Sequence, residues 1–304
     1  MRHAVFTDTT NFLVIDRGDI IEIGGKQYQV IGNEREGRFG MEDPKFWVKR
    51  ALDLETGEKK IIKLSFLESF DRTLAGVKIR CFRNPDKEGE ILKLVKDHPH
   101  FMHGNSLRDT KNNNIRILDI VTGTDFYTYI ESLDMDYHAY FHQLLPGIMK
   151  NIIKAFEAIR FLHINKLKHG DIRNDHLIIE QNTGNYVWID FDYDYDTEEN
   201  PWGLDLFGLG NILAYAVGKG FHDFYMIKRE KACYGDLINF LEPEDFSIIH
   251  QWRLFNLKKV YPYIPITLND ILMHFSRGAE VFYETVEEIM EDLNICLYSF
   301  FETV

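Results

Sequence analysis

The sequence predicts an α+β protein in which a strand-rich amino-terminal part precedes a mainly helical carboxy-terminal part. Short runs of β-branched and aromatic residues, separated by glycine-containing turns, fill residues 11–66. From Leu145 onward the apolar residues recur at spacings of three or four, which is the period of an amphipathic helix. Between these parts, residues 169–192 combine two aspartates with two short apolar runs.

The strand-rich part continues into a helix and then into further strands. Strands are predicted at residues 12–15, 20–23, 28–32, 45–51 and 60–64. Residues 85–96 are predicted to form an amphipathic helix, because acidic residues occupy its first turn and lysine its last. Two more strands are expected at 114–121 and 125–131, with Gly123 as the turn between them.

The carboxy-terminal part contains helices of two kinds. The apolar residues from Ile148 to Leu162 form one stripe, which predicts a helix with a single buried face. Residues 202–217 are apolar around most of the circumference, and this pattern predicts a buried helix. Residues 268–301 are expected to form one or two helices that pack in the core, with a break near Arg277 and Gly278.

Residues 169–192 predict a β-hairpin that places two carboxylates side by side. The runs Leu177–Ile179 and Val187–Ile189 are joined by the turn Asn182–Asn185. Such a hairpin would bring Asp171 and Asp190 to the same end. One carboxylate can then accept a proton while the other holds a metal ion, a pairing that phosphoryl transfer from a nucleotide needs. A plain hairpin ending in two solvated aspartates is the alternative.

The order of these motifs resembles the protein-kinase-like superfamily. The family pattern is His-Arg-Asp-x-Lys-x-x-Asn followed by Asp-Phe-Gly, whereas residues 169–176 are His-Gly-Asp-x-Arg-x-x-His and residues 190–192 are Asp-Phe-Asp. The His-Gly-Asp and Asp-Phe-Asp motifs are more similar to those of small-molecule kinases of the aminoglycoside, choline and lipopolysaccharide type. A third motif opens the buried helix, where Asp205 is expected to accept backbone N–H groups of the catalytic loop or to cap the helix.

The resemblance implies a two-lobed fold with a nucleotide-binding lobe over residues 1–131 and a catalytic lobe over residues 132–304. ATP is the implied cofactor. Gly37 and Gly40 match glycines of the loop that approaches the phosphates, and Lys63 matches the lysine that holds the α- and β-phosphates.

The resemblance implies two further features of the nucleotide site, an ion pair to Lys63 and a segment beside the adenine. Glu88, or alternatively Glu90, would pair with Lys63. Residues 132–134 would connect the lobes, so Glu131 and Leu133 are expected beside the adenine.

The resemblance also implies roles in the reaction itself. Asp171 would be the base or orienter of the acceptor hydroxyl, and Arg173 would neutralise charge on the transferring group. Asp190 would hold Mg²⁺ or Mn²⁺. His176 replaces the metal-binding asparagine and either offers a nitrogen ligand or only hydrogen-bonds the loop. Asp192, which replaces the glycine, could supply the missing ligand.

Three departures from the family pattern keep the functional alternatives open. Arg35 replaces the first loop glycine, and Ile61 stands where alanine usually covers the adenine. Only residues 193–203 separate Asp-Phe-Asp from the buried helix, without a long activation loop or an Ala-Pro-Glu anchor. The chain could therefore be a protein-kinase-like or atypical phosphotransferase, a small-molecule kinase, or a nucleotide-binding pseudokinase.

Composition limits the partners. The 304 residues carry a formal net charge of −13, which argues against a general nucleic-acid or anionic-membrane binder. No apolar run reaches membrane-spanning length, and the amino terminus lacks the apolar core of a signal peptide. The three cysteines are scattered and suggest no disulfide framework. We therefore expect a cytoplasmic protein whose partners are ATP and an unidentified hydroxyl acceptor.

Overall fold

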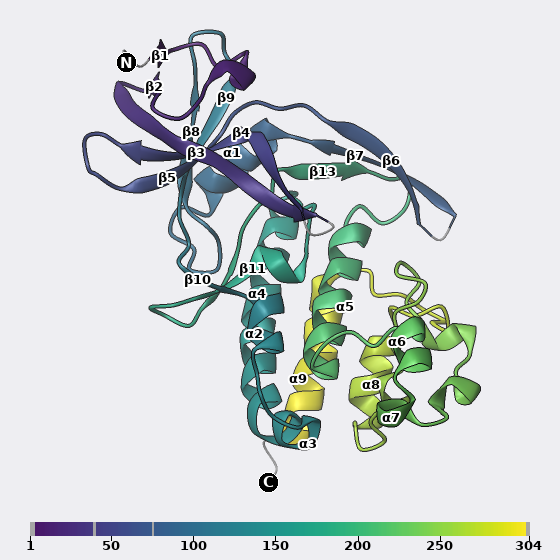
Figure 1. Cartoon of the computed structure of the whole chain (residues 1–304). Helices are drawn as coiled ribbons and strands as arrows, with labels where there is room; N and C mark the ends of the chain where they lie inside the picture. Colours follow the sequence, from purple (N-terminus) through teal and green to yellow (C-terminus); the bar gives the residue numbers. More distant parts are fainter. Residues whose placement is uncertain (1–3, 39–40, 75, 302–304) are drawn as a thin grey trace.

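The computed structural model describes residues 4–38, 41–74 and 76–301, and these form two stacked lobes. Strands dominate the lobe that holds the amino terminus, and helices dominate the lobe that holds the carboxy terminus (Figure 1). The predicted α+β class with two lobes is therefore confirmed. Among the described residues, no helix combines the length and apolarity that crossing a membrane would require.

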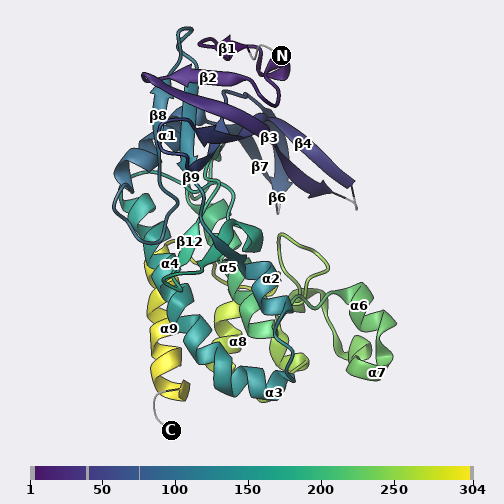
Figure 2. The same ribbon diagram turned by 60° about the vertical axis from the view of Figure 1, so that its left-hand side comes forward.

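A curled seven-stranded sheet builds the amino-terminal lobe. Its strand order is β1-β2-β3-β4-β5-β9-β8, and every neighbouring pair is antiparallel except β1 and β2. The strands are β1 Val5–Phe6, β2 Ile20–Ile23, β3 Lys26–Arg38, β4 Met41–Asp53, β5 Lys59–Lys63, β8 Gly104–Arg108 and β9 Asn114–Asp119. Helix α1, Pro85–Leu94, lies beside β8 and β9 (Figure 2). The predicted strand at residues 12–15 is wrong, because Phe12–Val14 form a 3₁₀ turn, η1.

A second, smaller sheet joins the two lobes. Strands β6, Ser69–Leu74, and β7, Val77–Arg83, form a hairpin inserted between β5 and α1. Strand β13, Tyr193–Asp196, pairs antiparallel with β7 directly after the Asp-Phe-Asp motif. Figure 1 shows this sheet extending sideways from α1, above helix α5, Gly203–Gly218. The hairpin was not among the predicted elements.

The connection between the lobes differs from the prediction. Residues 126–131 form helix α2, not a strand, and the Asp125 side chain caps it by accepting the Thr128 N–H at 2.8 Å. Phe126 and Ile130, four residues apart, are its buried positions. Aromatic and β-branched residues suggested a strand here, but the cap and the spacing of four produce a helix.

Because α2 belongs to the helical lobe, the segment that connects the two lobes lies earlier in the sequence than the predicted residues 132–134. Strand β10, Gly123–Asp125, pairs with β11, Leu177–Glu180, of the helical lobe. Phe126 packs against Tyr186 and Tyr215 of the same lobe. The segment that leaves β9 is therefore residues 120–122. A lobe boundary at residue 131 remains a proposal, and the packing of α2 favours an earlier one.

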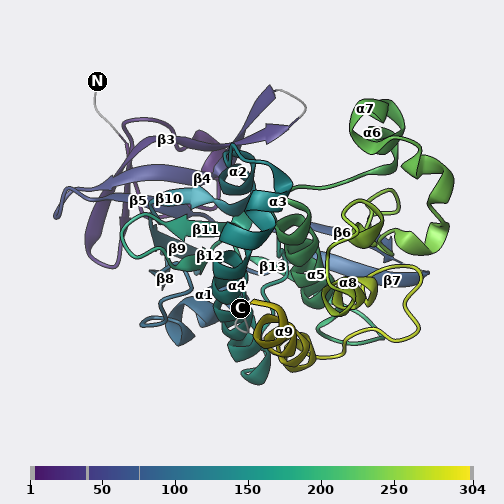
Figure 3. The same cartoon turned by 90° about the horizontal axis from the view of Figure 1, so that it is seen from below.

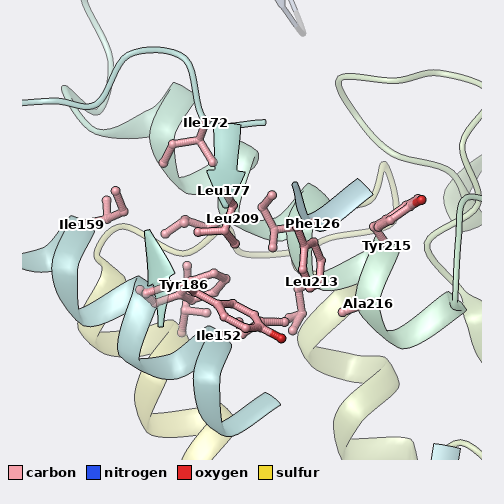
Figure 4. Close-up of a cluster of buried hydrophobic side chains, with 14 of the residues drawn as sticks. Phe126, Ile152, Ile159, Ile172, Leu177, Tyr186, Leu209, Leu213, Tyr215 and Ala216 are labelled. Carbon is pink, nitrogen blue, oxygen red and sulfur yellow. The ribbon is translucent and has the colours of Figure 1, made fainter. Parts of the chain in front are cut away.

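Helices α4 and α5 form the centre of the second lobe. Helix α4, Leu145–Ile164, and helix α5, Gly203–Gly218, agree with the predicted single-face and buried helices. Helices α8, Ile266–Met273, and α9, Val286–Phe301, agree with the prediction of one or two helices with a break near Arg277 and Gly278, and α9 runs beside α4 (Figure 3). Figure 4 shows the shared core, with side chains from α2, α4, α5 and the adjoining hairpin.

Shorter elements complete this lobe. They are α3 Tyr137–Ala139, a π-helical turn Tyr140–Leu144, η3 Asn174–His176, α6 Phe224–Arg229, α7 Lys231–Tyr234, η4 Leu237–Phe240, η5 Pro243–Asp245 and η6 Leu257–Lys259. The predicted hairpin is present as β11, Leu177–Glu180, and β12, Tyr186–Trp188. Trp188 fixes it to α4 by donating its indole N–H to the Ala155 carbonyl at 2.8 Å.

Candidate active site

The loop before β11 is attached to helix α5 through Asp205. The buried Asp205 carboxylate accepts the backbone N–H groups of His169 at 2.8 Å and Gly170 at 2.9 Å. His163 of α4 binds the same carboxylate at 3.0 Å. Burial alone would raise the pKa of Asp205, but the hydrogen bond and charge of His163 lower it below its usual value. The expected role of Asp205 as acceptor for the loop is confirmed by these bonds.

Gly170 is required by the close approach of β13 to the loop. Its φ is +86°, and a Cβ atom there would lie 1.9 Å from the Tyr193 carbonyl oxygen. A side chain at residue 170 would therefore push β13 away from the loop. Lys87 of α1 reinforces the contact by donating to the carbonyls of Lys168, His169 and Tyr193 at 2.8, 3.0 and 2.5 Å.

His176 lies between the two aspartates of the hairpin. Its Nδ1–H donates to the Asp171 carbonyl at 2.9 Å, and the same nitrogen is 3.5 Å from the Asp171 carboxylate. On the other side of the ring, Nε2 is 3.6 Å from Asp190 Oδ2. Burial raises the pKa of Asp171 and the charge of Asp190 adds to this, while His176 opposes it. The hairpin thus brings Asp171 and Asp190 to the same place, with one imidazole between them.

Lys63 of β5 contacts three carboxylates, one from α1 and two from the loop that precedes β13. Its ammonium bonds Glu88 of α1 at 2.8 Å, contacts Asp190, and lies 3.6 Å from Asp192. Burial would lower the pKa of Lys63, but Asp190, Asp192 and Glu88 together raise it above its usual value. The expected Lys63–Glu88 ion pair is present, and the alternative partner, Glu90, is exposed.

Glu88 is held from a second side. Arg116 of β9 donates to its other oxygen at 2.9 Å, and both side chains are almost completely buried. Leaving this carboxylate unpaired would be costly, so the two cations fix α1 against the sheet.

Asp190 has an unusual backbone and a strongly perturbed carboxylate. Its φ is +61°, in the left-handed region that residues other than glycine seldom adopt. Such strained residues concentrate at functional sites. Burial would raise the pKa of Asp190, but Lys63 and His176 hold it well below its usual range. The side chain is therefore an anion in the folded protein.

Asp192 is paired with cations. Its carboxylate accepts from Arg83 at 2.7 Å, and the side chain is only 2% exposed. The other oxygen, Oδ1, has no hydrogen-bond partner among the described residues.

Asp190 and His176 are the described residues whose free donor atoms could hold a divalent ion. Within the described part of the chain, no group of three or more His, Cys, Asp or Glu side chains is arranged to hold a metal ion. The Nδ1–H bond of His176 leaves the lone pair of Nε2 towards Asp190, so these two fit a site that phosphate oxygens would complete. Asp192 fits less well, since Arg83 and Lys63 already neutralise it.

Lys63, Arg83, Asp190 and Asp192 line a cleft of about 590 Å³ between the lobes, whereas Glu88, Asp171 and His176 are not among its lining residues. Its lining comprises Glu34, Arg35, Lys45, Trp47, Val48, Ile61, Lys63, Arg83, Met102, Leu118, Asp119, Ile120, Val121, Gly123, Asp125, Asp175, Ile178, Ile189, Asp190 and Asp192. One part is apolar, and the other carries Lys63, Arg83 and the carboxylates. Pockets of this size and character bind small organic ligands.

Several expected site residues lie elsewhere. Glu131 ends α2 and Leu133 follows it, and neither lines the cleft, because the connector is residues 120–122. Arg173 forms an ion pair with Asp175 at 2.5 Å and is 46% exposed. Gly37 is in β3, paired with Glu42 of β4, whereas Gly40 lies outside the described residues.

Arg83 and Lys87 are the site residues that sequence reasoning missed. Both flank the start of α1, and in the sequence they resemble ordinary surface cations. The available signal was the alternation of apolar residues over 77–81, which predicts a strand leading to Arg83.

Comparison with known proteins identifies the fold. No family model matches the chain, and no curated protein matches it either. Among solved structures, the kinase domain of PknI from Mycobacterium tuberculosis, solved as a point mutant, is similar, with a TM-score of 0.50 and 11% sequence identity. The match covers 93% of this chain and 98% of that domain. The chain has a protein-kinase-like fold.

Proposed function

We propose that this chain is an ATP-dependent phosphotransferase that transfers the γ-phosphate of ATP to a hydroxyl group. The observation that carries the proposal is the cluster of Lys63, Glu88 and Asp190, of which Lys63 and Asp190 line the cleft, with Asp171 close by across the ring of His176. Phosphoryl transfer depends mainly on positioning and on neutralising charge, and these groups supply both.

The apolar part of the cleft would hold the adenine. Val48, Ile61 and Leu118 line it from the sheet, and Ile178 and Ile189 from the hairpin below. Residues 119–121 form its edge, where backbone groups can hydrogen-bond a base. Ile61 narrows the space compared with an alanine, so the base would sit closer to the hairpin.

The polar part of the cleft would hold the phosphates. Lys63 remains a cation and can bind phosphate oxygens while Glu88 keeps it in place. Asp190 and His176 are the residues that would hold Mg²⁺ or Mn²⁺, and such an ion neutralises phosphate charge when bound.

Asp171 would orient the acceptor hydroxyl and take its proton. It lies on the loop that Asp205 fixes, half-buried, and its carboxylate is close to His176. Because burial raises its pKa, it is a stronger base than an exposed aspartate.

A small-molecule acceptor is the second candidate. The segment between β13 and α5 spans only residues 197–202, and the β6–β7 hairpin lies against β13. Few residues are left there to form a platform for an extended peptide, which favours a compact acceptor. A pseudokinase is favoured less, because Lys63, Glu88 and Asp190 are assembled and charged.

The test measures ATP hydrolysis and autophosphorylation for the wild type beside Asp190→Ala. We expect activity with Mg²⁺ or Mn²⁺ in the wild type and its loss in the variant. Nucleotide binding without turnover under any metal condition would favour the pseudokinase.

A further inference from the structure

The inserted hairpin brings a guanidinium group into the nucleotide cleft. Arg83 is the last residue of β7, and it lines the same cleft as Lys63 and Asp190. Four residue pairs join β7 to β13, beginning with Arg83 opposite Tyr193. The backbone of Arg83 is therefore fixed relative to the segment that carries Asp190.

The guanidinium is held rigidly on three sides. It donates from Nη1 to Asp192 at 2.7 Å and from Nε to Glu68 at 3.0 Å. Its central carbon, Cζ, lies over the ring of Tyr193, 4.2 Å from the centroid. The side chain is only 9% exposed. A guanidinium that is already oriented loses little entropy when it binds an oxyanion.

The negative charge of the phosphates also favours a cation at the position of Arg83. A transferring phosphoryl group carries negative charge on three oxygens, and neutralising it is the main task of such a site. Lys63 is shared among carboxylates, and Arg173, which is paired with Asp175, is not itself among the residues that line the cleft. Two arginines line the cleft, Arg35 and Arg83, and Arg83 is the one bonded to Asp192, two residues from Asp190. Its hydrogen bonds to Asp192 and Glu68 use Nη1 and Nε, and Nη2 can donate to phosphate oxygens.

We propose that Arg83 binds the terminal phosphate of the bound nucleoside triphosphate and that Asp192 is a positioning residue that orients it. This inference rests on the proposed function, because it assumes that a nucleotide occupies the cleft. It also gives a reason for the aspartate at residue 192, where the family pattern has glycine. The hairpin then contributes to catalysis as well as to the structure.

The test compares ATP and ADP affinities by calorimetry in the presence of Mn²⁺, with no acceptor and no turnover needed. For Arg83→Gln we expect ATP affinity to fall by about tenfold to 100-fold, the loss of one charge-assisted contact, and ADP affinity to change little. The ATP affinity of Arg83→Lys should lie between those of the wild type and Arg83→Gln. Arg80→Gln is the matched control, because Arg80 is an exposed arginine of the same strand that pairs with Asp196 outside the cleft lining.

A second variant separates phosphate binding from folding. Arg83→Gln leaves the buried Asp192 without one cation, so Arg83→Gln/Asp192→Asn removes that charge as well. The double variant should keep the wild-type ADP affinity and still lose the preference for ATP. Equal losses for ATP and ADP, or a preference lost in Arg173→Gln and kept in Arg83→Gln, would overturn the assignment. A wild type that binds neither nucleotide would instead overturn the proposed function.

Discussion

His176 faces both aspartates of the hairpin, and its hydrogen bonds decide which nitrogen meets Asp190. Since Nδ1–H donates to the Asp171 carbonyl, Nε2 carries the lone pair in the neutral ring. The sequence alone left open whether this histidine is a ligand or a structural residue. The structure contains the structural hydrogen bond and leaves the other nitrogen 3.6 Å from Asp190, so both roles are compatible.

The first prediction concerns the metal ion. Imidazole nitrogen suits Mn²⁺ better than Mg²⁺, whereas the amide oxygen of asparagine suits Mg²⁺. We expect the wild type to be more active with Mn²⁺, and His176→Asn to shift the preference towards Mg²⁺. Initial rates with each ion, for both proteins, are the measurement. A wild type that prefers Mg²⁺, together with an unchanged preference in the variant, would show that His176 is structural only.

The second prediction concerns pH. Burial raises the pKa of Asp171, and a general base must be deprotonated, so kcat/KM should fall as pH decreases through this raised pKa. His176 opposes the rise. His176→Asn removes this opposing interaction and should move the acid limb of the profile to higher pH. A pH–rate profile of both proteins tests this, and a limb that moves to lower pH contradicts the assignment of Asp171 as the base.

At the scale of elements, the β6–β7 hairpin and β13 form the part of the site that sequence reasoning did not find. Apolar residues alternate over Val77, Ile79 and Cys81, so a strand was detectable. Its partner β13 is more than a hundred residues away, and a single sequence gives no signal for such a pairing. Helix α2 was missed for a different reason. Its aromatic and β-branched residues are typical of a strand, and the capping residue Asp125 was not recognised as the start of a helix.

The third prediction tests the contact between β13 and the loop. Gly170→Ala places a Cβ 1.9 Å from the Tyr193 carbonyl and forces an alanine to a φ of +86°, so we expect a loss of about 1–3 kcal/mol in the free energy of unfolding. Urea denaturation is the measurement. Gly147→Ala in α4 is the control: open space surrounds it, and a gain of about 0.5–1 kcal/mol is expected. Equal effects in both variants would contradict the close packing of β13.

At the scale of the whole molecule, the order of motifs was sufficient to predict the fold. Asp171, Asp190 and Asp205 follow one another as in the family pattern, and the structure places them around one loop. Arg173 and Leu133 show the limit of that approach, because matching positions does not determine where a side chain points or where a connector lies. The charged side chains at the cleft come from several strands and from the loop before β13, and only tertiary structure shows that Arg83 joins them.

The fourth prediction tests the central claim, that the cleft is a nucleotide site in which Lys63 and Asp190 act on the phosphates and Asp171 acts on the acceptor. ATP is titrated into the protein by calorimetry with Mg²⁺ and with Mn²⁺, for the wild type, Asp190→Ala and Asp171→Asn. We predict metal-dependent ATP binding by the wild type, a large loss of affinity in Asp190→Ala, and near wild-type affinity in Asp171→Asn, whose transfer rate should fall instead. The absence of detectable binding by the wild type at millimolar ATP would contradict the account.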